Sequence, residues 1–291
     1  MKKLLLALIL LLPSTAFAGF SVPGCAPGTF AFIAQKQYGS EQGPTKVEGN
    51  ILVTKDDGLA KIGAHNTVKG TLIADKIELG TGAVVDNCIA DTITGPGTCT
   101  NVLGTFSAAP IECKVFTFVP PANDICVNTA LAVNVPAGQT ETLAPGCYKY
   151  VRVGLGGTLL LEDGVYVMGE LRTLAGGTVQ GTTVGRSRVI ARTVTISPLS
   201  RLPHLDILTS SLIGDSVVLG NSVTFEDTQL IAAGSGIHLH TGFVANNSGV
   251  AAVRVVVEPG QFKDVPENPV CKCTDGFHLP PFTPAQQCFP D

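Results

Sequence analysis

Short apolar runs of four or five residues, each bounded by turn residues, recur along most of this chain. Examples are Arg192–Ile196, Ser222–Phe225 and Gln229–Ala232. Val, Ile and Leu supply most of their apolar positions, and pairs such as Gly-Asp, Gly-Asn and Gly-Ser separate them. Runs of this length and composition are typical of β-strands, whereas an amphipathic helix repeats its apolar positions over a longer stretch. The pattern therefore predicts an all-β protein.

Self-similarity at longer range indicates how these strands are arranged. The segment Leu143–Tyr148 (Leu-Ala-Pro-Gly-Cys-Tyr) returns further along the chain as Leu161–Tyr166 (Leu-Glu-Asp-Gly-Val-Tyr), and each leads into Gly-Gly-Thr. Three other related segments begin at Val47, Val68 and Val85, with a similar spacing. A repeat of about 20 residues fits one coil of three short strands and leaves no room for an αβ crossover, whereas the alternative, a β-sandwich, needs no such repeat. We therefore predict a right-handed parallel β-helix over residues 46–262.

Two of these segments resemble coils of known β-helix proteins. Residues 62–76, Ile-Gly-Ala-His-Asn-Thr-Val-Lys-Gly-Thr-Leu-Ile-Ala-Asp-Lys, resemble coils of bactofilins, the polymer-forming β-helix proteins of bacteria. The Leu-x-Pro-Gly-x-Tyr segment at 143–148 is similar to coils of secreted bacterial β-helix proteins, including ice-binding-type adhesion domains. The resemblance implies the fold and, through the bactofilins, self-association. Bactofilins are cytoplasmic and poor in cysteine, however, and this chain differs in both respects.

The N-terminus has the three-part pattern of a secretory signal peptide. Residues 1–3 carry two lysines, residues 4–12 are apolar, and residues 16–18 read Ala-Phe-Ala. Nine apolar residues are too few to span a bilayer, which takes about 20. We expect cleavage after residue 18, and no Cys follows that would make the product a lipoprotein. The mature protein is predicted to be a secreted bacterial protein without a transmembrane segment, located in the periplasm, on the outer surface or outside the cell.

Composition narrows the possible functions. Without the two lysines of residues 1–18 the net charge is 17 − 23 = −6, so the chain has no basic surface of the kind that binds nucleic acid. Charged residues make up 14% of the chain, compared with about 25% in an average protein. Few charges and 52 Gly plus Pro residues (33 + 19) disfavour long solvent-facing helices.

Three segments lack the coil repeat. Residues 19–45 and 263–291 are predicted to be caps, because the open end of a β-helix presents unpaired strand edges. Residues 95–145 are rich in Pro and Cys and are predicted to form a disulfide-stapled insertion beside the solenoid.

Nine cysteines in a secreted chain indicate disulfides, with one cysteine left over. A zinc site is the alternative, but the chain has no Cys-x-x-Cys pair, and the Cys-Lys-Cys of residues 271–273 is a poor chelate for a tetrahedral ion. Proximity favours the pairs Cys88–Cys99 and Cys113–Cys126, and a further bridge within the trio Cys271, Cys273 and Cys288.

The strongest candidate for site chemistry is the segment Gly-Ile-His-Leu-His at 236–240. His238 and His240 are two positions apart, so on a strand both imidazoles point to the same face and can meet one metal ion or substrate. A neighbouring coil would supply a third ligand, with Asp215, Glu226 and Asp227 as candidates. The alternative is two histidines on a solvated face with no ligand, and the chain predicts no cofactor.

Secreted β-helices include polysaccharide-cleaving enzymes, whose chemistry needs paired carboxylates or a base near calcium-binding acids. None of the phrases typical of polygalacturonase-like enzymes is assembled here. The candidate residues are Asp56, Asp57, Glu162, Asp163, Asp206, Asp215, Glu226 and Asp227, with Arg186 and Arg188 as cations.

Aromatic or threonine-rich faces are the other surfaces from which binding could be inferred. Tyr148 and Tyr166 occupy equivalent places in successive coils, which predicts an internal ladder rather than a carbohydrate platform. The Thr-x-Thr pairs at 92–94, 140–142 and 193–195 do not recur coil after coil. The chain is therefore predicted to be a non-catalytic structural or adhesion-type protein that contacts envelope polysaccharide or copies of itself, with a polysaccharide-active enzyme as the alternative.

Overall fold

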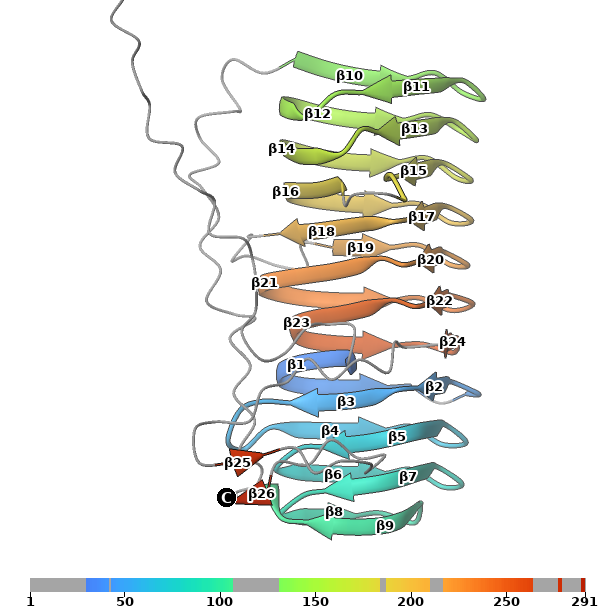
Figure 1. The fold of residues 1–291 in the computed structure, drawn as a ribbon. Helices are drawn as coiled ribbons and strands as arrows, with labels where there is room; N and C mark the ends of the chain where they lie inside the picture. The colour runs from blue at the N-terminus through green and yellow to red at the C-terminus, as the bar shows by residue number, and fades with distance from the viewer. Residues whose placement is uncertain are drawn as a thin grey trace, which may run out of the picture.

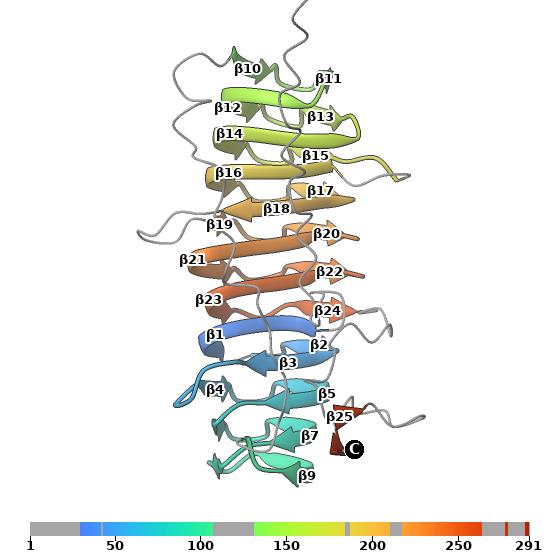
Figure 2. The same cartoon turned by 60° about the vertical axis from the view of Figure 1, so that its left-hand side comes forward.

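The computed structural model describes residues 30–41, 43–106, 131–183, 187–209 and 217–263, and the short strands at 277–278 and 289–290. Strands β1 to β24 form one sheet with parallel pairing, wound into an elongated stack of coils (Figures 1 and 2). The predicted all-β fold and parallel β-helix are confirmed. Within these ranges, no helix is long and apolar enough to cross a membrane. The expected signal peptide and Cys113, Cys126, Cys271, Cys273 and Cys288 lie outside the described residues.

Each coil contributes to three faces, which we call A, B and C. Several strands bend at a corner and contribute to two faces. Six of them begin on face A and end on face B: β1 (Phe30–Ser40), β12 (Gly146–Val153), β14 (Gly164–Thr173), β16 (Ser187–Ile196), β21 (Gln229–Leu239) and β23 (Gly249–Val257). Three others begin on face C and end on face A: β5 (Thr67–Ile73), β7 (Val84–Ile89) and β9 (Thr98–Gly104).

The other strands belong to one face each. Face A adds β3 (Asn50–Val53) and β18 (Leu205–Thr209). Face B adds β4 (Leu59–Ile62), β6 (Lys76–Leu79), β8 (Thr92–Thr94), β10 (Leu131–Val135) and β19 (Val217–Leu219). Face C adds β2 (Lys46–Glu48), β11 (Thr140–Leu143), β13 (Thr158–Leu161), β15 (Thr178–Gln180), β17 (Arg201–Pro203), β20 (Thr224–Glu226), β22 (Val244–Asn246) and β24 (Gln261–Lys263). Strands β25 (Phe277–His278) and β26 (Phe289–Pro290) pair with each other and are antiparallel.

The core follows from the two-residue period of the strands. On face C, for example, Leu159, Val179 and Leu202 point inward and are fully buried, while the residues between them point outward. Parallel register places each inward residue next to its equivalent in the neighbouring coils, so the interior consists of aliphatic ladders. Each fully buried aliphatic side chain contributes about 1.5–3 kcal/mol to folding.

The coils do not follow one another in chain order along the stack. Strand β1 pairs with β23 on one side and with β3 and β4 on the other, and β2 lies between β24 and β5. The first coil of the chain therefore packs against the last coil in the middle of the stack, where blue β1 lies beside red-orange β23 in Figure 1. We call this contact the seam. The open ends are formed by β8 and β9 at one end and by β10 and β11 at the other.

Two of the segments that lack the coil repeat in sequence nevertheless contain strands of the stack. Within residues 19–45, β1 is an internal member of the stack. Within residues 95–145, β9, β10 and β11 are coil strands, and residues 107–130 lie outside the described part of the chain. The repeat spacing predicts the coils, but it does not state which coils are neighbours, because pairing of the first coil with the last leaves no mark in a local pattern.

An aromatic cluster fills the core at the seam. The Phe32 ring of β1 lies 4.5 Å from the ring of Phe262 in β24 and 5.2 Å from that of Tyr38. Phe243 adds a fourth ring at 6.1 Å from Phe262. All four side chains are at most 1% exposed. The two halves of the chain are thus joined by their largest buried side chains as well as by strand pairing.

Face A has apolar residues on its outer side as well as its inner side. One column of outward residues is in register across the seam, and each of its members is at most 3% exposed. The column consists of Ile190, Leu208, Ile231, Ala251, Ile33, Leu52, Ile73 and Ile89. Along this column, face A therefore offers little free surface to a ligand.

The predicted Cys88–Cys99 disulfide is present, with Cα atoms 6.2 Å apart. It links β7 to β9 in the coils at one end of the stack, where the last coil pairs with one other coil among the described strands. Cys147 is also disulfide-bonded. Disulfides of this kind contribute about 2–4 kcal/mol by restricting the unfolded chain.

Phe262→Ala should destabilise the protein by about 3–5 kcal/mol, because it removes a fully buried ring from the seam and leaves a cavity. Chemical denaturation followed by circular dichroism would measure the loss. Val244→Ala, on the outer side of the neighbouring strand β22, is the matched control and should change stability by less than about 1 kcal/mol. Equal effects of the two substitutions would show that the seam is not a centre of stability.

Candidate metal-binding cluster and outer faces

His238 and His240 lie on the outer side of face B, as their two-residue spacing predicts. Ile237 and Leu239, which alternate with them at the end of β21, are buried in the core. The two imidazole centroids are 4.1 Å apart and the rings are tilted by 31°. Their side chains are 30% and 32% exposed, so the pair lies in the surface and is not fully solvated.

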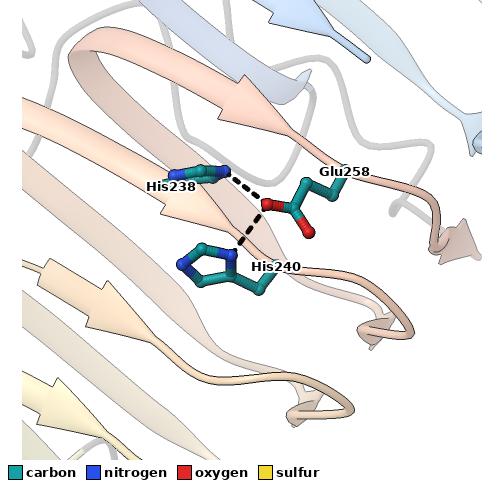
Figure 3. Close-up of side chains that lie close together, drawn as sticks. All are labelled: His238, His240 and Glu258. Carbon is teal, nitrogen blue, oxygen red and sulfur yellow. Dashed lines mark hydrogen bonds and ion pairs between the residues drawn. The ribbon is translucent and has the colours of Figure 1, made fainter. Parts of the chain in front are cut away.

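Glu258, directly after β23 in the next coil, completes the cluster (Figure 3). Its Oε1 atom lies 3.0 Å from Nε2 of His238 and 2.8 Å from Nδ1 of His240. Among the described residues, these three side chains are the one group of three or more His, Cys, Asp and Glu residues close enough to hold a metal ion, with ligand atoms within 4.8 Å of one another.

The other oxygen of Glu258 is held by the turn that follows β21. Oε2 accepts hydrogen bonds from the Thr241 amide at 2.9 Å and from the Thr241 hydroxyl at 2.7 Å. Burial alone would raise the pKa of Glu258. The hydrogen bonds from the Thr241 hydroxyl, from His240 and from the Thr241 amide outweigh it and lower the pKa to about 2. Glu258 is therefore a fixed carboxylate that stays ionised in moderately acidic solution.

His238 is the incompletely satisfied member of the cluster. Its Nε2 atom is buried and makes no hydrogen bond, although it lies 3.0 Å from the Glu258 oxygen. The short distance is therefore a contact between polar atoms whose angles do not form a hydrogen bond. A buried polar atom without a partner costs about 1–3 kcal/mol, which gives this atom a reason to accept a further ligand.

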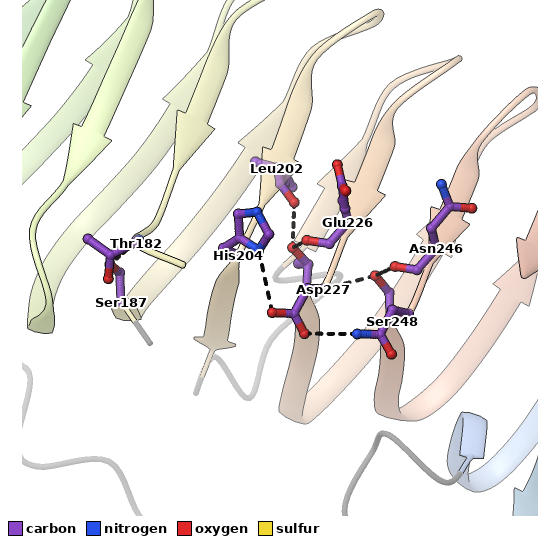
Figure 4. A network of polar contacts seen from close by, with 10 residues as sticks. Thr182, Ser187, Leu202, His204, Glu226, Asp227, Asn246 and Ser248 are labelled. Atoms are coloured by element: carbon purple, nitrogen blue, oxygen red, sulfur yellow. Dashed lines mark hydrogen bonds and ion pairs between the residues drawn. The ribbon is translucent and has the colours of Figure 1, made fainter. Parts of the chain in front are cut away.

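The third ligand was expected elsewhere. Asp227 instead approaches Nδ1 of His204 at 3.4 Å and accepts a hydrogen bond from Asn247 at 3.2 Å (Figure 4). Glu226 lies on the outer side of face C, and Asp215 lies outside the described residues. One sequence signal points to Glu258: it follows His240 by 18 residues, which is the length of one coil.

The contacts in Figure 4 belong to the corner between faces C and A. His204, Asp227 and Asn247 occupy equivalent positions in three coils, and all three have positive φ values of 58°, 47° and 47°. Beside them, the buried hydroxyls of Thr228 and Ser248 bind backbone groups of the same and neighbouring coils. These polar groups turn the chain at the corner, so they have a structural role.

Other acids considered for polysaccharide cleavage also have structural contacts. Lys76 donates to Asp57 at 2.9 Å, and Arg188 lies 3.8 Å from the buried Asp206. Glu162 and Asp163 are exposed in a turn, and Arg186 lies outside the described residues. Among the described residues, the candidate acids therefore do not come together in one site.

A hollow of about 850 Å³ lies along face B near β1, β4 and β6. Glycine turns form much of its lining, together with Glu41, Lys61 and Glu78. Lys61 and Glu78 face each other at 3.7 Å. The hollow contains an exposed ion pair rather than a cluster of acids.

Tyr148 and Tyr166 form the internal ladder that the repeat predicts. Their rings stack at 6.3 Å with an interplanar angle of 23°, and they are 8% and 0% exposed. Their hydroxyls donate to backbone carbonyls, Tyr148 to Ala144 and Tyr166 to Leu143 and Glu162. Tyr150 lies outside the core, with the Arg152 guanidinium 4.4 Å from its ring centroid.

Face C carries an outer column that the Thr-x-Thr pairs do not reveal. Parallel pairing aligns one outward residue from each coil, and eight of the eleven are β-branched, six Thr and two Val. We call it the threonine column: Thr140, Thr158, Thr178, Arg201, Thr224, Val244, Gln261, Lys46, Thr67, Val84 and Thr98. Its members are half-buried or exposed.

Comparisons with known proteins add a distant structural similarity. No protein-family model and no curated protein matches the chain. A solved ice-binding protein from the Antarctic ascomycete Antarctomyces psychrotrophicus is similar at 18% identity and a TM-score of 0.34, over 86% of this chain and 99% of the other.

The lowered pKa of Glu258 predicts a specific acid sensitivity. A carboxyl whose pKa is lower in the folded state contributes stability above its unfolded value, near 4.5, and that contribution is lost as the pH falls toward 2. Glu258→Gln should therefore make stability less dependent on pH between about 4.5 and 2. Denaturation midpoints measured across this range would test it. Glu226→Gln, at an exposed position of face C, is the control and should keep the wild-type slope.

Proposed function

We propose that this protein is an extracellular, non-catalytic structural protein that binds envelope polysaccharide through face C. The observation that carries the proposal is the threonine column. Its β-branched side chains have stiff χ1 angles and repeat at the strand spacing of about 4.8 Å, so a long row of methyl and hydroxyl groups is held in place before binding. A surface ordered in advance loses little conformational entropy when it binds an extended partner.

The other two faces fit such a partner less well. On face A, the outward apolar column from Ile190 to Ile89 is buried. The outward residues of face B include charged side chains, and the sign of the charge differs from coil to coil. Examples are Arg152, Glu170, Arg254 and Lys61. On face C, by contrast, Thr140, Thr158 and Thr178 follow one another in adjacent coils with no charged residue between them in the column. Threonine methyls can pack on the apolar faces of sugar rings, and threonine hydroxyls can bind sugar hydroxyls.

End-to-end self-association, as in a polymer of coils, is less favourable. At the open end formed by β10 and β11, Glu141 pairs with Leu159, whose side chain is buried in the core. Glu141 therefore occupies an inward register position in the terminal coil. An inward-pointing charge at an edge strand opposes the addition of another strand.

The test is binding of the mature protein to isolated bacterial envelope, peptidoglycan and insoluble polysaccharides, with ice as a further ordered surface. The double substitution Thr158→Ala, Thr178→Ala should weaken binding at least about tenfold, a loss of about 1.4 kcal/mol, because two steps of the row lose their hydroxyl and γ-methyl groups. Thr195→Ala, which changes an outward threonine of face B, is the matched control and should bind like the wild type.

Three results would contradict the proposal. They are unchanged binding by the face C double variant, equal loss in the face B control, and release of reducing or unsaturated sugar ends by the wild type. The last result would favour the enzyme alternative. If the wild type bound only to ice, and the double variant lost this binding, face C would still be the binding surface. The ligand would then be ice and not a polysaccharide.

A further inference from the structure

We propose that His238, His240 and Glu258 form a binding site for one divalent transition-metal ion, with Zn²⁺ as the best fit. The site lies on face B and is independent of the polysaccharide surface proposed on face C. It joins the end of β21 to the turn after β23, so Glu258 lies in the last coil, which forms the seam, and the two histidines lie in the coil before it.

The donor set selects the class of metal. Two imidazoles and one carboxylate are ligands that suit Zn²⁺, Cu²⁺ and Ni²⁺, whereas Ca²⁺ and Mg²⁺ prefer oxygen ligands alone. Three protein ligands leave one position of a tetrahedral ion for water or an external ligand atom.

The distances are close to those that a tetrahedral ion requires. With metal–ligand distances of about 2.0–2.1 Å, neighbouring ligand atoms of a tetrahedron are about 3.4 Å apart. The Glu258 oxygen is 3.0 Å from the His238 nitrogen and 2.8 Å from the His240 nitrogen. These two distances would open by about half an ångström when the ion binds, and the two histidine nitrogens lie within 4.8 Å of each other.

Two further observations point to a ligand at this place. The buried Nε2 atom of His238 has no hydrogen-bond partner, and a metal ion at the centre of the cluster would satisfy it. Thr241 holds the far oxygen of Glu258 with two hydrogen bonds and so orients the near oxygen toward both histidines. Such supporting bonds fix the ligands of metal sites and typically change metal affinity 10–100-fold.

The mature, disulfide-bonded protein, freed of metal by a chelator and dialysed, should bind one equivalent of Zn²⁺ in isothermal titration calorimetry. Zn²⁺ should also raise its melting temperature, because only the folded chain holds the three ligands together. With Cu²⁺ in place of Zn²⁺, electron paramagnetic resonance should show coupling to two nitrogen atoms.

His238→Ala, His240→Ala and Glu258→Gln should each abolish the rise in melting temperature and weaken Zn²⁺ binding at least about 100-fold. Thr241→Val should weaken it about 10–100-fold, because the valine lacks the supporting hydroxyl. His204→Asn is the matched control: it removes a histidine that faces one carboxylate only, and asparagine tolerates the positive φ at that position. This variant should bind Zn²⁺ like the wild type.

Circular dichroism spectra identical to the wild type would establish that each variant folds. The proposal is overturned by the absence of Zn²⁺ binding to the wild type at large excess. It is equally overturned by wild-type affinity in a folded His238→Ala, His240→Ala double variant, which would place the bound ion elsewhere on the protein.

Discussion

Parallel register between successive coils is the constraint on which the rest of this structure depends. Because each strand inside the stack pairs in register with its equivalents on both sides, a residue type that recurs once per coil becomes a continuous row on the surface or in the core. Register creates the aliphatic interior, the apolar outer column of face A and the threonine column of face C. It also places Glu258 beside two histidines of the preceding coil. A one-residue slip would turn every inward side chain outward, so the core itself enforces the register.

The sequence predicts the features that follow from the repeat within one or two coils. The β-helix, the tyrosine ladder, the Cys88–Cys99 disulfide and the common face of His238 and His240 all follow from spacings no longer than a single coil. Glu258 was missed because the candidates Asp215, Glu226 and Asp227 all precede the histidines in the chain, whereas Glu258 follows His240 by 18 residues, the length of one coil. The threonine column was missed for a related reason. Thr140, Thr158 and Thr178 stand a full coil apart, so a search for Thr-x-Thr pairs within one strand does not find them.

The order of the coils could not have been predicted in the same way. A repeat shows that coils exist, but every coil edge can pair with every other edge of similar register. The choice of β1 and β23 as neighbours depends on long-range complementarity, such as the fit of Phe32 against Phe262.

The apolar outer column of face A has a clearer signal in the sequence. Its strands are apolar at consecutive positions, as in Phe-Ala-Phe-Ile-Ala at 30–34, and such runs are typical of strands covered on both sides.

The seam also determines the order in which the chain can fold. Strands β1 and β23 are neighbours in space, but nearly the whole of the described chain lies between them in sequence, from Ser40 to Gly249. One edge of the first strand to be synthesised therefore has no native partner until the last coil exists. Contacts between such distant parts of a chain form slowly, and an unpaired strand edge is a template for association with other chains. A nascent or refolding molecule is consequently most vulnerable to aggregation at the strand that ends up in the middle of the finished stack.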